Sequence, residues 1–308
     1  MQILFCAPGA NPEPWLEELA AALPRAHIRV WEEGDHDPAD YAVVWKPPLE
    51  MLQGRSGLKA VFNLGAGVDA LLQYGDALPA VPIVRLDDAG MALQMAEYVT
   101  YAVLRYFRRF DQFALQEARG EWKFMKPYSK ADFTVGILGL GVLGQRIAAA
   151  LAHFNFPLVG WSRTQKDLPG VTCHVGADGL DAVLRASKAL VCVLPLTPET
   201  TGILNRDSLG KLAQGSYLIN VARGAHVVEG DLLELVQLGH IAGATLDVFA
   251  HEPLPPEHPF WTEPNITITP HVSALTLRAA SVRQIAKKIA ALQQGQPIAG
   301  VIDRSKGY

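Results

Sequence analysis

Residues 133–144 read Phe-Thr-Val-Gly-Ile-Leu-Gly-Leu-Gly-Val-Leu-Gly, an apolar strand pattern that runs into a Gly-x-Gly-x-x-Gly turn. A helical pattern follows over 145–151, so the order is strand, glycine turn, helix. Gly139 and Gly141 let the backbone turn sharply and approach a pyrophosphate, and Gly144 lets the helix pack on the strand. The N–H groups at the helix start favour an anion. This stretch therefore predicts a parallel α/β domain that binds a dinucleotide; a tight turn without a ligand is the alternative.

Short apolar runs bounded by turn residues recur on both sides of this stretch and predict further strands. Longer amphipathic stretches separate most of them, which is typical of parallel α/β domains. The 308 residues fit two domains with a cleft between them. Helical patterns at 91–113 and 275–292 are placed to connect these domains, which makes the first domain discontinuous. The expected strands cover residues 3–5, 28–30, 41–45, 59–64, 133–138, 158–161, 189–194, 216–221, 243–248 and 266–269.

The composition narrows the class of protein. Hydrophobic residues make up 49% and charged residues 19%, which indicates a globular chain. A net charge of -4 argues against a nucleic-acid or anionic membrane partner. Cys6, Cys173 and Cys192 form no CxxC pair, so we expect neither disulfides nor a metal site. There is no basic leader, and no run approaches the ~18 apolar residues of a membrane span. We therefore expect a cytoplasmic protein with a small-molecule substrate.

The choice of cofactor is expected to depend on the residues after the strand at 158–161. An acidic residue there would hold the ribose 2′-hydroxyl of NAD, whereas a basic residue would accept the 2′-phosphate of NADP. The chain continues Ser162-Arg163-Thr164, and the first carboxylate is Asp167, just after Lys166. The planar guanidinium of Arg163 suits a phosphate. We therefore expect NADP(H) to be preferred and NAD(H) to be possible; Arg163 as an ordinary surface residue is the alternative.

Three of the later strands end in groups suited to the reduction of a carbonyl acid. These groups are Arg223 in NVARG, Glu252 before a proline, and His271 in TPH. In doubly wound sheets such strand ends line the crevice where ligands bind. Arg223 is suited to a carboxylate and His271 to donating a proton, while Glu252 would keep the imidazolium available at neutral pH. Taken singly, each has a structural alternative: a helix-capping arginine, a charge in a loop, or a structural histidine.

These segments and the glycine turn together resemble the D-isomer-specific 2-hydroxyacid dehydrogenase family over nearly the whole chain. Within that family the chain is most similar to the bacterial glyoxylate and hydroxypyruvate reductases of the A type. The motifs that carry the resemblance are WKPP at Trp45, LGAGVD at Leu64, WSRT at Trp161, NVARG at Asn220, EPLPPE at Glu252, ITPHVSA at Ile268, and the final Asp303-Arg304 with Gly307-Tyr308.

The resemblance implies an α/β fold with two doubly wound parallel-sheet domains. Residues 1–95 and 277–308 would form a flavodoxin-like substrate-binding domain, and 96–276 a Rossmann NAD(P)-binding domain. The implied activity is NADPH-preferring reduction of glyoxylate to glycolate and of hydroxypyruvate to D-glycerate, with His271 as proton donor. A dehydrogenase of the same fold for formate, phosphoglycerate or bulkier 2-oxo acids is one alternative. A nucleotide-sensing binding protein is the other.

The resemblance also suggests which residues contact each ligand. On the substrate side, the backbone of Ala66 and Gly67 would face the carboxylate beside Arg223 and His271. Trp45 would wall the pocket, or else belong to the core. The glycines at 65 and 67 also fit a simple turn without a ligand. The expected cofactor contacts are Gly139, Gly141, Val142, Leu143, Gly144, Ser162, Arg163, Lys166, Leu194, Pro195, Val221, Ala222 and Asp247.

The segment 108–130 is expected to be an excursion from the domain, because it mixes charged residues with phenylalanines and Trp122. In the resembled family a comparable arm embraces a second subunit. We therefore expect a homodimer, with a packed local lid as the alternative.

Overall fold

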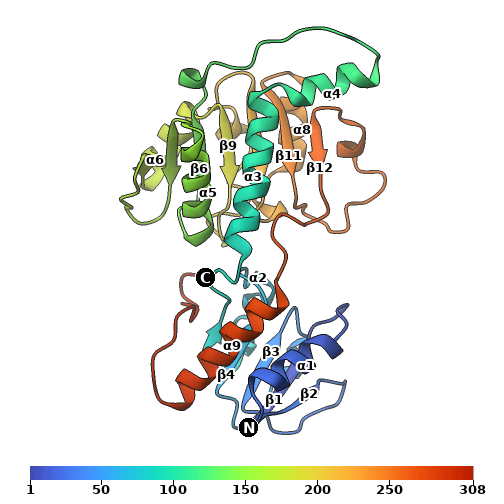
Figure 1. Ribbon diagram of the computed structural model, residues 1–308, viewed down its shortest axis with the longest axis vertical. Helices are drawn as coiled ribbons and strands as arrows, with labels where there is room; N and C mark the ends of the chain where they lie inside the picture. The colour runs from blue at the N-terminus through green and yellow to red at the C-terminus, as the bar shows by residue number, and fades with distance from the viewer. Residues whose placement is uncertain (308) are drawn as a thin grey trace. The chain divides into compact units, whose positions relative to one another are not determined.

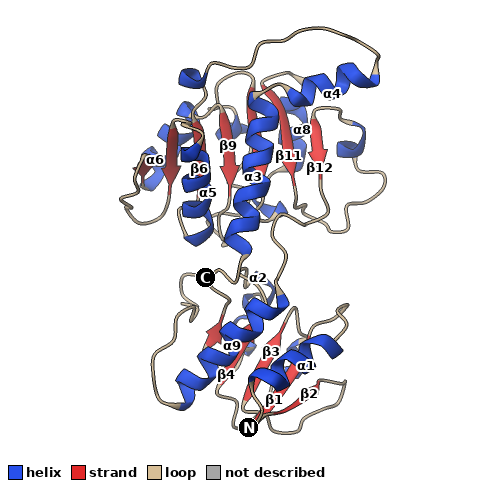
Figure 2. Ribbon diagram, viewed as in Figure 1, coloured by secondary structure: helices blue, strands red, loops and turns tan. Residues whose placement is uncertain are grey.

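The computed structural model describes residues 1–307, which form two compact units. The first unit takes residues 1–90 and the chain from residue 276 onward, and the second takes Met91–Leu275. Each unit is a parallel sheet covered by helices, so the α/β fold class expected from the sequence is confirmed (Figure 2). Tyr308, which closes the expected terminal motif, lies outside the described residues.

In the described part of the first unit the sheet has five parallel strands in the order β2-β1-β3-β4-β5 (Figure 1). This is the flavodoxin-like doubly wound order. Helices α1 and α9 lie together, and the Arg278 guanidinium Nε is 2.6 Å from Glu18 Oε1. The elements are β1 Gln2–Cys6, α1 Glu13–Ala22, β2 His27–Val30, β3 Tyr41–Val44, the 3-10 turns Leu49–Met51 and Gly75–Ala77, β4 Ala60–Asn63, α2 Asp69–Leu72, β5 Ile83–Val84 and α9 Arg278–Gln293.

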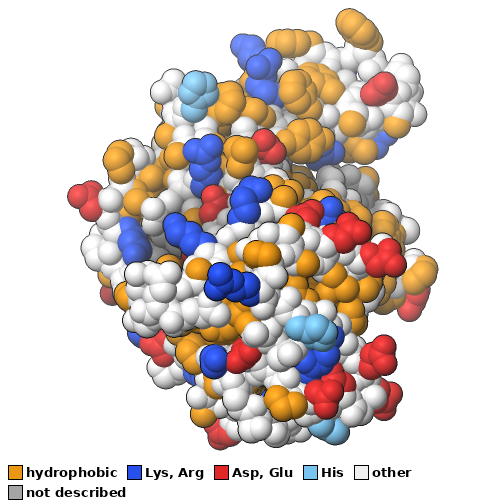
Figure 3. Space-filling view, turned by 60° about the horizontal axis from the view of Figure 1, so that its bottom comes forward, with side chains coloured by type: hydrophobic (Ala, Val, Ile, Leu, Met, Phe, Trp, Pro, Cys, Tyr) orange, Lys and Arg blue, Asp and Glu red, His pale blue; other side chains and the backbone are white. Residues whose placement is uncertain are grey.

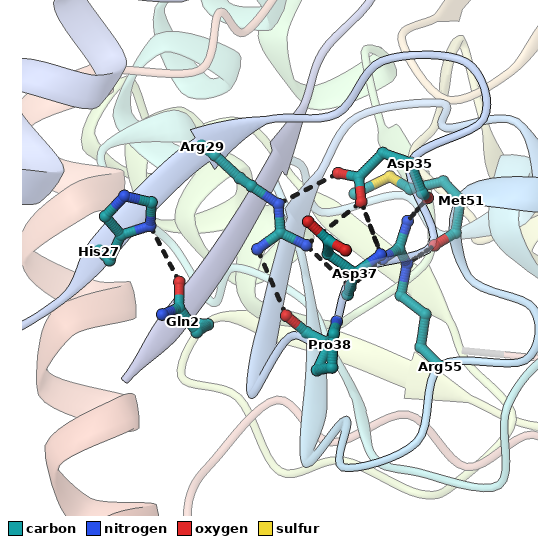
Figure 4. A network of polar contacts seen from close by, with 8 residues as sticks. All are labelled: Gln2, His27, Arg29, Asp35, Asp37, Pro38, Met51 and Arg55. Atoms are coloured by element: carbon teal, nitrogen blue, oxygen red, sulfur yellow. Dashed lines mark hydrogen bonds and ion pairs between the residues drawn. The ribbon is translucent and has the colours of Figure 1, made fainter.

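A buried arginine holds the loop between β2 and β3. Arg55 donates hydrogen bonds to the backbone carbonyls of Asp35, Asp37 and Met51, as Figure 4 shows. Arg29 Nε lies 3.1 Å from the Asp35 carboxylate. Burial raises the pKa of Asp35, but hydrogen bonds from Arg29 and Asp37 and the two arginine charges outweigh it, so this pKa lies below its usual value. This loop has no regular secondary structure, and charge-assisted hydrogen bonds hold its conformation instead.

The second unit has, within its described residues, seven parallel strands in the order β12-β11-β10-β9-β6-β7-β8. The strand order reverses between β6 and β9, and such a switch point is where doubly wound sheets bind ligands. Its elements are α3 Met91–Phe107, α4 Phe110–Ala118, β6 Val135–Leu138, α5 Val142–His153, β7 Leu158–Trp161, β8 Val171–His174, α6 Gly176–Ala186, β9 Ala189–Cys192, α7 Arg206–Leu209, β10 Ser216–Asn220, α8 Glu229–Gln237, β11 Ile241–Leu246, β12 Ile266–Ile268, and the 3-10 turns η3 Lys130–Asp132, η4 Gly224–His226 and η5 Pro259–Thr262.

Both faces of this sheet are buried, and helices cover each of them. Helices α3 and α5 pack on one face, and residues of α6, α7 and α8 share the core on the other (Figure 1). Successive residues of β9 alternate between the two cores: Val191 joins the first, and Leu190 and Cys192 join the second. This is why the strands appear as continuous apolar runs in the sequence. Complete burial raises the pKa of the Cys192 thiol to about 12.

The helix expected over 91–113 is interrupted, so that expectation was wrong in its extent. Helix α3 ends at Phe107, and Arg109 adopts a left-handed conformation with φ 64° before α4 begins at Phe110. The left-handed region is costly for a residue with a Cβ. The Arg109 guanidinium carbon lies 4.8 Å from the centre of the Tyr128 ring, which stabilises the turn.

The surface carries charges of both signs. In the face drawn in Figure 3, Lys and Arg side chains are scattered among acidic, apolar and uncharged ones. Within residues 1–307, none of the helices combines the length and apolar character needed to cross a bilayer.

Candidate active site

The glycine turn follows β6 at the switch point of the second unit. A Cβ on Gly144 would lie 1.8 Å from the Gly139 carbonyl oxygen, and one on Gly139 would lie 2.8 Å from the Val193 oxygen. The packing of the chain itself therefore requires these two glycines. Gly141 differs, because its φ is -77° and a Cβ there would meet nothing within 4 Å. Open space at the start of α5 is what an incoming phosphate needs, so these residues fit a dinucleotide.

The first turn of α5 offers hydrogen-bond donors to such a ligand. Gly141 is the N-cap and contributes no side-chain cap, so the N–H groups of Val142 and Leu143 keep their capacity for an acceptor. Val142 is exposed, and Leu143 is partly buried. Leu194, which follows β9, lies against Gly139. The remaining expected cofactor contacts on this side are buried or half-buried: Lys166, Pro195, Val221 and Ala222.

The chain after β7 turns so that its basic residue is exposed. Ser162 is buried, and its hydroxyl donates to the Thr164 carbonyl at 2.8 Å. Arg163 beside it is exposed. A hydrogen bond from Thr197 is the main reason that the pKa of Glu199 is lowered, and the charge of Arg163 contributes to the same shift. Arg163 therefore acts electrostatically on the loop that follows β9, next to the glycine turn.

His271 and Glu252 come together at the end of the sheet. His271 Nδ1 lies 2.8 Å from Glu252 Oε2, and Glu252 Oε1 accepts a hydrogen bond from the Phe249 N–H at 3.1 Å. Both carboxylate oxygens are thus engaged, which fixes the orientation of the imidazole. The His271 side chain is 39% exposed, and Nε2 is the ring nitrogen that does not face Glu252.

A buried aspartate organises the loop that carries His271. Asp247 Oδ1 accepts hydrogen bonds from the Thr269 hydroxyl at 2.6 Å and the Val272 N–H at 2.8 Å, and Oδ2 accepts from the Ser273 N–H at 2.8 Å. The His271 N–H donates to the Asp247 carbonyl at 2.8 Å. The Asp247 carboxylate thus accepts its hydrogen bonds from the loop that carries His271. The expected contact of Asp247 with the cofactor stays a prediction.

Arg223 is the N-cap of the short turn η4 and lies three residues after the end of β10. The side chain of Asn220 clamps this turn by donating to the Arg223 carbonyl at 3.0 Å and accepting from the Ala222 N–H at 3.1 Å. A Cβ on Gly224 would lie 1.8 Å from the carbonyl carbon of Phe249. Phe249 belongs to the loop that carries Glu252, so the arginine and glutamate loops are in direct backbone contact.

The expected substrate-side residues lie in the first unit, after β3 and β4. The Trp45 ring packs against Gly65, where a Cβ would lie 2.5 Å from it. Asn63 donates to the carbonyls of Gly65 and Gly67 at 3.0 and 2.8 Å. Within residues 1–307 no acceptor binds the N–H groups of Ala66 and Gly67. A turn with its carbonyls held inward and its N–H groups available is suited to an anion.

Sequence reasoning missed three residues that shape the site. Asn63 and Asn220 are the last residues of β4 and β10, and both are buried. An Asn at the end of an apolar strand, just before a glycine-containing turn, is the sequence signal that could have identified them. His226 is fully buried beside Arg223 and had no such signal. Among residues 1–307, no group of three or more His, Cys, Asp or Glu side chains is arranged to hold a metal ion.

Residues 100–273 match the sequence-family model of the D-isomer specific 2-hydroxyacid dehydrogenase NAD-binding domain. The chain belongs to this family. It is 52% identical to the glyoxylate/hydroxypyruvate reductase A of Serratia proteamaculans, and the match covers 100% of both chains. Family membership, inferred above from the motifs, is thereby confirmed.

Solved structures of the family have the same fold over the whole chain. A D-isomer specific 2-hydroxyacid dehydrogenase from Xanthobacter autotrophicus in complex with NADPH and MES has a TM-score of 0.95 and 40% identity, covering 100% of this chain and 99% of that one. An NADPH-dependent glyoxylate/hydroxypyruvate reductase from Sinorhizobium meliloti in complex with NADP and sulfate has a TM-score of 0.93 and 38% identity, with the same coverage.

Proposed function

We propose that the chain is an NADPH-preferring reductase of small 2-oxo acids, which converts glyoxylate to glycolate and hydroxypyruvate to D-glycerate. The observation that carries the proposal is the 2.8 Å pair of His271 Nδ1 and Glu252 Oε2, on the same sheet edge as Arg223 and the glycine turn. The names of the Serratia and Sinorhizobium relatives support this choice of substrates. The NADPH and NADP in the related structures support the cofactor.

The substrate is held through its carboxylate. Arg223 presents a planar guanidinium, which can form two parallel hydrogen bonds to a carboxylate and its neighbouring carbonyl. The N–H groups of Ala66 and Gly67 are proposed as further donors, with Trp45 limiting the size of the acid. Two-point binding fixes which face of the carbonyl carbon receives the hydride.

The reaction needs a hydride and a proton. NADPH, when bound, supplies the hydride to the carbonyl carbon. His271 donates the proton from Nε2 to the carbonyl oxygen as negative charge develops there. Glu252 accepts from Nδ1–H, which holds the ring in place. The balanced result is a 2-hydroxy acid and NADP⁺ from a 2-oxo acid, NADPH and one proton.

The dinucleotide is held by the second unit. The N–H groups of Val142 and Leu143 would bind the pyrophosphate at the start of α5, where the space beside Gly141 is open. Arg163, with Ser162 and Lys166 in the same turn, would bind the 2′-phosphate that distinguishes NADPH from NADH.

The assembly is proposed to be a homodimer in the cytoplasm. Helix α4 and the chain after it lie at one end of the second unit (Figure 1). This segment exposes large apolar side chains, with Trp122 fully exposed and Phe124 at 79%. Exposed aromatic groups of this size are typical of protein interfaces. All three cysteines are free, which suits a reducing compartment. A mass of one chain by light scattering would contradict the dimer.

The experiment that tests the function follows NADPH and NADH by absorbance, with glyoxylate, hydroxypyruvate, pyruvate or 2-oxoglutarate as substrate. We expect rapid oxidation of NADPH with the first two acids and slower oxidation of NADH. A preference for NADH would contradict the role of Arg163 alone. Tight nucleotide binding without turnover of any 2-oxo acid would contradict the reductase and favour a nucleotide-sensing protein.

A further inference from the structure

A fully buried histidine lies beside Arg223 and has no part in the mechanism above. His226 ends the turn η4, and each of its ring nitrogens faces a backbone group. Nδ1 lies 3.2 Å from the Arg223 nitrogen and 3.0 Å from the Arg223 oxygen, while Nε2 lies 3.2 Å from the Pro195 oxygen. The ring therefore bridges the arginine turn and the loop after β9.

The hydrogen bonds around Arg223 determine where the proton of this imidazole lies. The Arg223 carbonyl already accepts from Asn220 Nδ2 at 3.0 Å and from the His226 backbone N–H at 3.2 Å. A carbonyl oxygen has two lone pairs, so its capacity is filled. Nδ1 is therefore the acceptor for the Arg223 N–H, and Nε2–H donates to the Pro195 carbonyl. This is a neutral imidazole with both nitrogens engaged.

The ring joins a segment beside the proposed nucleotide site, at Pro195, to the segment that carries the proposed substrate anchor, Arg223. Pro195 follows β9 at the switch point, on the side of the nucleotide, and its carbonyl also accepts from the Thr200 hydroxyl at 2.8 Å. Backbone bonds run parallel to the ring: the Gly202 N–H donates to the Ala225 carbonyl at 2.8 Å. Two links therefore join these segments: the backbone bond between Gly202 and Ala225, and the imidazole, which contacts the backbone of Arg223 itself.

We propose that His226 is a positioning residue for substrate binding, with Nδ1 fixing the backbone of Arg223 and Nε2 fixing the nucleotide-side loop at Pro195. The inference rests on the proposed function, because it takes Arg223 to be the anchor of the substrate carboxylate. A displacement of such an anchor by about 1 Å can lower kcat/KM on the order of 10²-fold. A buried histidine that only fills space would affect stability instead.

Three substitutions separate the two nitrogens. His226→Asn keeps an acceptor near the position of Nδ1 and removes the donor to Pro195. His226→Gln keeps an N–H near the position of Nε2 and removes the acceptor for Arg223. His226→Leu removes both and retains most of the volume. Leu209→Ala is the matched control, because Leu209 is fully buried on α7 in the same unit and lies in none of the contacts above.

The expected result is a split between the two ligands. His226→Gln should raise the KM for glyoxylate by about tenfold or more and leave the Kd of NADPH near that of the wild type. His226→Asn should give the reverse pattern, and His226→Leu should show both losses. Leu209→Ala should lower the melting temperature and change neither ligand constant.

Binding of oxalate to the complex with NADP⁺, measured by calorimetry, reports the grip of Arg223 without turnover. A wild-type protein that reduces no 2-oxo acid would contradict the proposed function. Oxalate and NADPH affinities that change together in the Asn and Gln variants, or that stay unchanged in His226→Leu, would overturn the positioning role. Losses in the His226 variants that only follow their melting temperatures, as in Leu209→Ala, would overturn it as well.

Discussion

Gly141→Ala should weaken nucleotide binding while leaving the fold intact. The φ of Gly141 is -77°, which any residue can adopt, and a Cβ there would meet nothing within 4 Å. Replacing a glycine in such a conformation restricts the unfolded chain and should raise the free energy of unfolding by about 0.4–1 kcal/mol. The added methyl group would also occupy the space through which a phosphate approaches the start of α5, and nucleotide binding would weaken for that reason.

The size of the loss follows from hydrogen-bond geometry. A phosphate oxygen must come within about 2.9 Å of a backbone nitrogen, and a methyl group beside that nitrogen keeps it farther away. Loss of one hydrogen bond to a charged group costs about 1.5–3 kcal/mol. The Kd of NADPH should therefore rise by roughly 10- to 100-fold.

Two further glycines provide the comparison for this test. Gly230→Ala, in α8, also adds a Cβ with nothing within 4 Å and should leave the Kd unchanged. Gly144→Ala would force the start of α5 away from Gly139 by roughly 1 Å or more, so it should lose both nucleotide binding and stability. Fluorescence titration with NADPH and thermal unfolding measure the two effects. An unchanged Kd in Gly141→Ala would refute a phosphate site at this turn.

Four more outcomes can be measured. Arg163→Ala should raise the KM for NADPH by about tenfold and leave that for NADH unchanged, because only NADPH carries the 2′-phosphate; equal changes contradict the assignment. His271→Ala should lower kcat by about 10²- to 10⁴-fold without lowering the melting temperature, and near-normal turnover would exclude its acid role. The pKa of Asp35 is depressed in the folded state, so its stabilisation is complete above the unfolded value of about 3.9 and is lost as the pH falls through the lower folded value. Urea unfolding should therefore find Asp35→Asn less stable than wild type at neutral pH, with a difference that shrinks as the pH falls below about 3.9, whereas a gap that does not depend on pH would contradict the ion pair. Cys173 should react with a thiol reagent well before Cys192, whose burial raises its pKa to about 12, and equal rates would argue against the buried core.

Most of the architecture could be predicted because buried parallel strands leave continuous apolar runs. The run at 189–194 is one example, and it corresponds to β9. Strand β5 has only two residues, Ile83–Val84, which is too short for a pattern. The break at Arg109 also leaves no mark, because Phe110 and Phe113 continue the helical spacing across it. The turn depends on a contact with Tyr128, which is distant in sequence.

In the site, too, the residues that could be predicted have local sequence signals, whereas contacts between residues distant in sequence could not be predicted. Arg223, Glu252 and His271 could be predicted as site residues because each follows a strand, and the structure places the last two 2.8 Å apart. The part played by Asp247 was not accessible in this way. Its partners are the Thr269 hydroxyl and two backbone N–H groups, and only the paired register of β11 and β12 brings them within reach.

The close contact of Gly224 with the backbone of Phe249 has a consequence for attempts to redesign the enzyme. Neither loop can change its course without a matching change in the other, since no side chain fits between them. Homologous segments taken from a relative with different selectivity would have to be transferred as a pair, 221–226 together with 247–252. A chimera that carries one foreign loop against its original neighbour should fold with Arg223 and Glu252 out of register.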